Sequence, residues 1–166
     1  MVYNLIKALD SRFPFSTAKA HCDIPCGIYD PITAQIAALT VVRMTDLLLE
    51  HENDENKGTA QHANSMSRYI AIKEEHAEKA KHEIRIIWGD FIKPAHIEKF
   101  PELHELTHSI MMLGSTCRQK VDRDSALKLV AELNRFAEIF WKIKGEETVV
   151  AKAPYAPGLD IVYRKV

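Results

Sequence analysis

The sequence has little of several features that define whole classes of protein. Only six glycines and 8% aromatic residues in 166 residues, with no repeat, argue against a fibrous or disordered chain. Three cysteines are too few for a disulfide scaffold. No uninterrupted apolar run approaches the roughly 20 residues of a membrane span. A net charge of −1, with basic and acidic residues interleaved, argues against a nucleic-acid binder.

What the sequence does have is the composition of one globular domain. It is 46% apolar and 27% charged, and it is long enough to bury a core without staples. The odd number of cysteines leaves at least one thiol free, which favours a reducing compartment, so we predict a cytoplasmic protein. Residues 1–20 lack the continuous apolar stretch of a secretory signal, because Asp10 and Arg12 interrupt it. We interpret residues 1–20 as a non-secretory leader or an N-terminal arm, with secretion as the second choice.

Four stretches repeat apolar residues at the spacing of an amphipathic helix. Because no strand pattern of comparable length is present, they predict an all-α fold, an antiparallel four-helix bundle over residues 32–144. Residues 145–166 read as an irregular tail, in which Val149–Val150 and Ile161–Tyr163 can pair. The predicted helices run from Pro31 into the charged "EHENDENKG" turn, from Ala60 to Phe91, from Pro101 to Gly114, and from Asp122 or Asp124 to Trp141.

The most unusual chemistry lies in "HCDIPCGIYDP", residues 21–31. His21, Cys22 and Cys26 carry imidazole and thiol groups, which are ligands for soft and borderline metals. The spacing is not Cys-x-x-Cys, and no second cysteine pair follows, so a structural zinc site does not fit. A proline-rich turn with two buried thiols explains the same residues equally well at this point.

A cut after Ala20 would change the chemistry of this segment. His21 would then carry a free α-amine with a pKa of about 8, which can lose its proton and bind metal. The amine, the backbone nitrogen of Cys22 and the sulfurs of Cys22 and Cys26 would form a planar set of two nitrogens and two sulfurs. Such a set suits nickel(II) or copper(II). Residues 21–31 would therefore be an N-terminal metal-binding hook.

Three segments resemble one known family. "HCDIPCGIYDP" resembles the N-terminal nickel hook of the nickel superoxide dismutases, in which the mature chain begins at the histidine. "WGDFIKPAHIEKFPELHEL", from Trp88 to Leu106, resembles that family's connection between its second and third helices, and "IFWKIK" near Ile139 resembles its last helix. The resemblance runs from His21 to about Lys144.

The resemblance implies an activity and a set of site residues. A homohexamer would convert superoxide to dioxygen and hydrogen peroxide by cycling nickel between Ni(II) and Ni(III), after a dedicated protease has removed the leader. The nickel ligands would be His21 through its amine and ring nitrogen, Cys22 through its amide nitrogen and thiolate, and Cys26 through its thiolate. Tyr29 and Asp23 would lie beside the metal, with the Tyr29 hydroxyl near the vacant axial side. The enzyme would need neither nucleic acid nor a membrane as a partner.

The sequence departs from the family pattern at three positions. Ala37 stands where the first helix of better-known members has a glutamate that binds the axial imidazole, and His76 stands where an arginine is linked to that glutamate. Phe91 replaces a tyrosine. The residues that would orient the metal-binding imidazole therefore differ from the family pattern, although the ligands are intact.

Other interpretations of the sequence remain open. A helical protein that binds nickel or copper without turnover, or a thiol-redox module, fits the same hook. "HELTH", from His104 to His108, has the letters of a zinc-protease helix, but apolar residues take the inward face and we expect both histidines at the surface. We expect Cys117 to be a buried thiol rather than a ligand.

Overall fold

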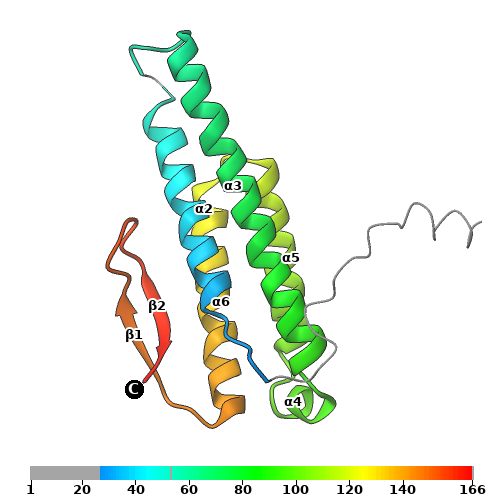
Figure 1. Cartoon of the computed structure of the whole chain (residues 1–166). Helices are drawn as coiled ribbons and strands as arrows, with labels where there is room; N and C mark the ends of the chain where they lie inside the picture. Colours follow the sequence, from blue (N-terminus) through cyan, green and yellow to red (C-terminus); the bar gives the residue numbers. More distant parts are fainter. Residues whose placement is uncertain (1–26, 53, 166) are drawn as a thin grey trace, which may run out of the picture.

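The computed structural model describes residues 27–52 and 54–165. The bundle is formed by α2, α3, α5 and α6, each antiparallel to the next (Figure 1), and α6 returns to pack on α2. The predicted all-α four-helix bundle is confirmed. Along the chain, the elements are α2 (Ile32–Glu50), α3 (Ala60–Ile86), the π-helical segment η1 (Ile87–Phe91), α4 (Pro94–Lys99), α5 (Leu103–Gln119), α6 (Arg123–Lys144), β1 (Thr148–Lys152) and β2 (Asp160–Arg164).

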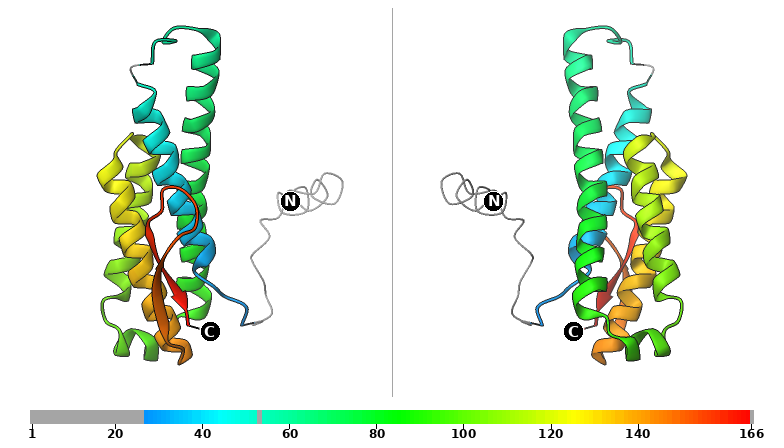
Figure 2. Two further views of the ribbon diagram at one scale, coloured as in Figure 1. Left: turned by 90° about the vertical axis from the view of Figure 1, so that its left-hand side faces the viewer. Right: turned by 90° about the vertical axis from the view of Figure 1, so that its right-hand side faces the viewer.

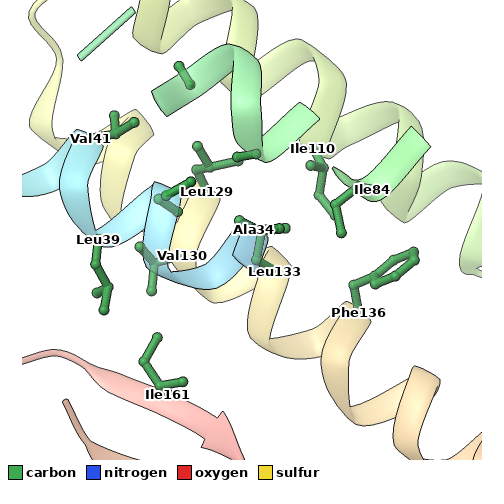
Figure 3. Close-up of a cluster of buried hydrophobic side chains, with 14 of the residues drawn as sticks. Ala34, Leu39, Val41, Ile84, Ile110, Leu129, Val130, Leu133, Phe136 and Ile161 are labelled. Atoms are coloured by element: carbon green, nitrogen blue, oxygen red, sulfur yellow. The ribbon is translucent and has the colours of Figure 1, made fainter. Parts of the chain in front are cut away.

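The core combines small residues on α2 with larger ones on the facing helices. The alanine side chains of α2 let α3 and α6 approach closely, and bulky side chains of α6 fill the space that remains. Each large side chain buried in this way stabilises the fold by about 1.5–3 kcal/mol. Figure 3 shows the central group, to which α2, α3, α5, α6 and β2 contribute Ala34, Leu39, Val41, Ile84, Ile110, Leu129, Val130, Leu133, Phe136 and Ile161.

Among the described residues, α2 is the one helix that is long and apolar enough to cross a membrane by length and composition alone. Half of its apolar window is buried inside the bundle, against α3 and α6. The charged residues Arg43 and Asp46 also interrupt the apolar sequence of α2, so the helix has no continuous apolar run. This pattern is explained by the position of α2 as a core helix of the bundle.

The helix ends follow from local side-chain chemistry. Thr59 and Asp122 precede α3 and α6, and each accepts a hydrogen bond at 3.2 Å from the backbone N–H three residues further on. Gly145 ends α6 with φ of +77°, a backbone conformation that favours glycine. The prediction that Asp122 caps the last helix is confirmed.

The prediction that Gly114 ends the third bundle helix is wrong. Gly114 lies inside α5 and is buried, because α5 and α3 approach each other closely at this point. A Cβ atom on Gly114 would lie 2.6 Å from Cγ of Lys81, whose Nζ donates a hydrogen bond to Ser115 Oγ. The glycine therefore serves helix packing rather than helix termination.

The end of α5 is held instead by a buried lysine of α3. Lys73 is 2% exposed, and its Nζ donates hydrogen bonds to the C=O groups of Cys117, Arg118 and Lys120. These carbonyls have no partner within the helix, so the ammonium group acts as their cap. Burial lowers the pKa of Lys73 from its ordinary value.

Replacing Gly114 by alanine tests this close approach. We expect Gly114→Ala to destabilise the protein by about 1–2 kcal/mol, because the added methyl displaces the Lys81 stem. In a Lys81→Ala background the same change should stabilise by up to about 1 kcal/mol, since alanine is the better helix former. Denaturant unfolding of the four chains of this cycle gives the coupling. Equal effects of Gly114→Ala in both backgrounds would contradict the account.

The sequence predicted an irregular tail, but residues 145–165 contain a β-hairpin. β1 and β2 pair antiparallel, with Val149 opposite Tyr163 and Val150 opposite Val162. This is the pairing that the sequence allowed. The hairpin forms because Ile161, 1% exposed, packs into the bundle core, which the local sequence pattern did not reveal.

Two amide side chains, the buried Gln35 and the half-buried Asn134, fasten the hairpin to the bundle. β2 lies between β1 and the helices (Figures 1 and 2). Asn134 of α6 donates a hydrogen bond to Asp160 O at 2.8 Å and accepts one from Val162 N–H at 3.2 Å. Gln35 of α2, 1% exposed, donates to Val162 O at 3.1 Å and to Asn134 Oδ1 at 2.8 Å. The outer edge of β2 is thus bonded to the bundle.

Candidate metal centre

All of the predicted nickel ligands lie outside the described residues. His21, Cys22, Asp23 and Cys26 all precede residue 27, so only Tyr29 of the predicted site residues has a described environment. What the structure describes is the segment that joins the hook to α2, residues 27–30, which we call the hook root. The hook root begins immediately after Cys26.

The backbone of the hook root is fixed by local hydrogen bonds. Gly27 has φ of +70°, which favours glycine, and its C=O accepts a hydrogen bond from Tyr29 N–H at 3.2 Å. Asp30 Oδ1 accepts a hydrogen bond from Ile32 N–H at 2.8 Å. This hydrogen bond lies at the start of α2, and it fixes the direction in which the chain enters the helix.

A lysine at the end of α6 reaches the hook root. Nζ of Lys144 donates a hydrogen bond to Gly27 O at 3.4 Å. The same ammonium group lies 5.6 Å from the centre of the Phe91 ring and 5.5 Å from that of Phe140, which are cation–π distances. Lys144 therefore links the residue that follows Cys26 to the end of the bundle.

Aromatic rings pack beneath the hook root. Phe91, at the end of η1, lies with its ring centre 5.6 Å from that of Tyr29, 5.6 Å from that of His96 and 4.9 Å from that of Phe140. These distances are typical of favourable aromatic pairs. Phe91 has no hydroxyl, so the phenol of Tyr29 and the imidazole of His96 supply the polar atoms of this aromatic cluster. The π-helical turn of η1 places Phe91 here, beside the start of α4.

A second lysine lies close by on the segment between η1 and α4. Nζ of Lys93 donates to Asp90 O at 2.7 Å, and its backbone N–H donates to His96 Nδ1 at 3.1 Å. Lys93 is exposed. Together with Lys144, it places positive charge at the end of the bundle that carries the hook root, which favours the approach of a small anion.

The two helix positions that depart from the family pattern do not form a pair like the linked glutamate and arginine of that pattern. Ala37 is 1% exposed in the core and has no polar side chain. His76 bonds through Nδ1 to Ile72 O, one turn earlier in α3, at 2.9 Å. Nδ1 is therefore the protonated nitrogen, because a carbonyl only accepts. Neither residue supplies a carboxylate for the imidazole of His21.

The remaining candidate ligands are excluded by their surroundings. Within residues 27–52 and 54–165, no group of three or more His, Cys, Asp or Glu side chains could hold a metal ion. His104 and His108 are exposed, as predicted, and His104 packs edge-on against Trp88 at 5.6 Å. Cys117 is 1% exposed, and burial raises the pKa of its thiol to about 11. It lies at the other end of α5 from the hook root.

Sequence reasoning named Tyr29 and Phe91 but missed Lys144 and His96. The Lys144 contact joins residues 117 positions apart, so no local pattern reveals it. The signal available was the position of Lys144 at the end of "IFWKIK", the segment that resembles the last family helix. His96 lies in "KPAH", shortly after Phe91, where the second predicted helix ends. No local pattern there indicates that its ring packs on Phe91.

Replacing Lys144 by methionine tests the contact with the hook root. Lys144→Met keeps the side-chain stem over the rings but removes the hydrogen bond to Gly27 and the positive charge. We expect the rate of superoxide removal to fall about fivefold, the value of one lost hydrogen bond of about 1 kcal/mol, with little change in nickel content. Lys142→Met is the matched control on the same helix. Equal rates in the two variants would contradict the role of Lys144.

Comparisons with known proteins agree on one family. The model of the family "Nickel-containing superoxide dismutase" matches residues 16–144. The chain is 34% identical over 131 residues to a superoxide dismutase [Ni] of Streptomyces coelicolor, covering 79% of this chain and 93% of the relative. For the enzyme of Streptomyces seoulensis the identity is 32% with the same coverage. A solved native nickel superoxide dismutase shares 33% identity at a TM-score of 0.65, covering 75% of this chain and 99% of that chain.

Proposed function

The chain belongs to the nickel-containing superoxide dismutase family, and from that membership we propose that cleavage before His21 completes its nickel site. The enzyme is a superoxide dismutase with nickel as its cofactor. It converts two superoxide ions and two protons into dioxygen and hydrogen peroxide. The ligands, the assembly and the maturation step are proposals for this chain.

The donor set that we propose fits nickel. After cleavage, His21 supplies the α-amine and a ring nitrogen, Cys22 an amide nitrogen and a thiolate, and Cys26 a second thiolate. Nitrogen and sulfur donors suit nickel(II) in square-planar geometry. When bound, nickel supplies the one-electron couple Ni(II)/Ni(III), and thiolate and amide donors stabilise the higher oxidation state. The amine has a pKa of about 8 when free, so it deprotonates readily on binding metal.

The contact between Lys144 and Gly27 is the observation that supports this site best. Gly27 follows Cys26 directly in the sequence, and Lys144 and the aromatic cluster lie beside Gly27, so we propose that the nickel site forms at this end of the bundle. Lys144 and Lys93 would attract superoxide to that end of the bundle. We assign Tyr29 and Asp23 to positions beside the metal, where the Tyr29 hydroxyl can hold a small anion or water.

Without a glutamate at position 37, the imidazole of His21 needs another partner. Neither Ala37 nor His76 offers a carboxylate. We propose that this enzyme orients the ring through backbone or hook groups, so its metal potential is tuned differently from that of family members with the carboxylate. The electron paramagnetic resonance spectrum of the oxidised enzyme would report this difference, because it depends on the axial ligand.

We also propose a cytoplasmic homohexamer that is matured by a dedicated leader-removing protease. The hexamer is supported by large apolar side chains that a single chain leaves exposed and that neighbouring subunits would cover. The exposed apolar residues on the bundle helices and η1 are Ile36, Leu49, Ile70, Trp88 and Met112.

The experiment that tests the proposed site uses the chain beginning at His21. It is loaded with nickel, its nickel content is measured, and superoxide removal is followed by stopped-flow absorbance. We expect about one nickel per chain and rapid superoxide removal. Nickel binding without turnover would contradict the proposed catalytic site and favour a metal-binding protein. Activity that does not depend on nickel would favour thiol-redox chemistry at Cys22 and Cys26.

A further inference from the structure

The outer strand of the C-terminal hairpin has apolar side chains that the chain does not bury. In β1, Val149 is 45% and Val150 is 57% exposed, whereas Ile161 and Val162 of β2 are 1% and 3% exposed. The β-branched residues of β1 therefore contribute little to the core of this chain. Because successive side chains of a strand point to opposite faces, each face of β1 carries one exposed valine beside the strand edge, and a strand paired to that edge can cover both.

The backbone of β1 has a free hydrogen-bonding edge. The ladder to β2 uses the odd-numbered residues of the first strand, because Glu147 O and Ala153 N–H bond across the hairpin at 2.9 Å and pairing alternates between them. The N–H and C=O groups of Thr148, Val150 and Lys152 therefore point away from β2. No group within residues 27–52 and 54–165 bonds to them.

The opposite edge of the hairpin shows that such groups can be satisfied within the chain. On β2, Asn134 and Gln35 bond to the outward groups of Asp160 and Val162. β1 has no such side chains beside it and lies on the outside of the hairpin (Figure 1). It also has no proline or bulge, the usual devices that prevent a strand edge from pairing with another chain, and Lys152 stands only at its end.

We propose that β1 pairs antiparallel with β1 of a second copy of this chain, about a twofold axis at Val150. The two hairpins would then form one four-stranded sheet. Val150 of one copy lies opposite Val150 of the other, and Thr148 lies opposite Lys152. In this register, every outward N–H of Thr148, Val150 and Lys152 meets a carbonyl of the other strand.

The sequence of β1 is complementary to itself in this register. No like charges face each other, because Lys152 lies opposite Thr148, and Glu146 of the second copy lies diagonally beside Lys152 on the same face. A shift of the axis by one residue would leave Thr148 or Lys152 without a partner inside the strand. The edge therefore specifies a second copy better than an unrelated peptide, and symmetric pairing closes after two chains.

This contact is separate from the proposed nickel site and from the family bundle. The hairpin lies beyond residue 144, where the family match ends. β1 would therefore add a contact between two subunits to whatever assembly the bundle forms. β2 lies between β1 and the helices (Figure 1), so we expect disruption of the contact to leave superoxide removal per chain unchanged.

The mass of the nickel-loaded protein tests the proposal, measured by native mass spectrometry or sedimentation. Val150→Lys places two lysines opposite each other on the axis, and Val150→Pro deletes the central N–H while leaving an exposed edge strand intact. We expect either change to weaken self-association at least about 100-fold and to lower the mass of the assembly. The control Val121→Lys adds the same charge at a similarly exposed valine, which is 46% exposed. It should leave the mass unchanged.

Hydrogen exchange gives a second readout that a folding defect would not imitate. In the parent protein, the outward amides of Thr148, Val150 and Lys152 should exchange at least about 100-fold more slowly than in Val150→Lys, while the inward amides of Val149 and Ala151 keep their protection. Rapid exchange of the outward amides in the parent, or an unchanged mass in both Val150 variants, would overturn the proposal. Loss of protection at Val149 would indicate unfolding of the hairpin, and Val150→Pro would then decide.

Discussion

Replacing Cys22 or Cys26 by serine is expected to abolish nickel-dependent superoxide removal, with a loss of at least about 1,000-fold. A serine hydroxyl does not ionise near neutral pH and is a poor ligand for a metal that needs sulfur donors. Each variant should also lose most of its nickel. Elemental analysis of the purified protein and stopped-flow measurement of superoxide decay give both quantities.

Cys117→Ala is the matched control for the cysteine variants. Its thiol is buried at the other end of α5, and burial raises its pKa to about 11, so it is not a thiolate near neutral pH. We expect normal nickel content and activity in this variant, together with a modest loss of stability from the missing buried sulfur. Full activity in Cys22→Ser or Cys26→Ser would place the nickel elsewhere and refute the proposed ligand set.

The precursor with its leader attached is expected to be inactive, at least about 100-fold below the mature enzyme. Residues 1–20 convert the amine of His21 into an amide, which binds metal only after losing a far more tightly held proton. One of the four planar donors is then missing. A full-length chain in which the residues around Ala20 resist cleavage, loaded with nickel and assayed for superoxide removal, measures this effect.

A chain with an inserted protease site provides the control for the precursor experiment. When a site-specific protease cuts that chain directly before His21, activity should return without refolding. If nickel-dependent activity is already present before the cut, the amine is not required. If activity stays absent after the cut although nickel is bound, the hook does not support turnover in this chain.

The bundle could be predicted from the sequence because its signals are local. Apolar residues at helical spacing, Asp30 and Asp122 at helix starts, and the absence of comparable strand patterns specify four helices. Gly114 was misread for the same reason. A glycine near the end of an apolar repeat has the same local signature whether it ends a helix or admits a neighbouring side chain such as the Lys81 stem.

The parts that could not be predicted depend on tertiary contacts. The hairpin is stabilised by Ile161 in the bundle core and by the amide side chains of Gln35 and Asn134, which lie far from it in the sequence. Lys144 donates a hydrogen bond to Gly27, which lies 117 residues earlier in the chain. No pattern within a few residues encodes either contact.

The hook was predicted for a different reason, because its residues are chemically distinctive rather than periodic. The recognition of "HCDIPCGIYDP" identified the family that the comparisons support. The same resemblance drew attention to the changes at Ala37 and His76. Neither residue carries a carboxylate that could replace the missing glutamate. How the imidazole of His21 is oriented therefore depends on groups outside these two positions.

The most direct test of the central claim, that the amine of His21 is a nickel ligand, compares two chains that differ by one residue. One begins at His21 and the other at Ala20, and both are loaded with nickel under the same conditions. The account predicts about one nickel per chain and rapid superoxide removal for the chain that begins at His21, and activity near background for the chain that begins at Ala20. Equal activity of the two chains would contradict it.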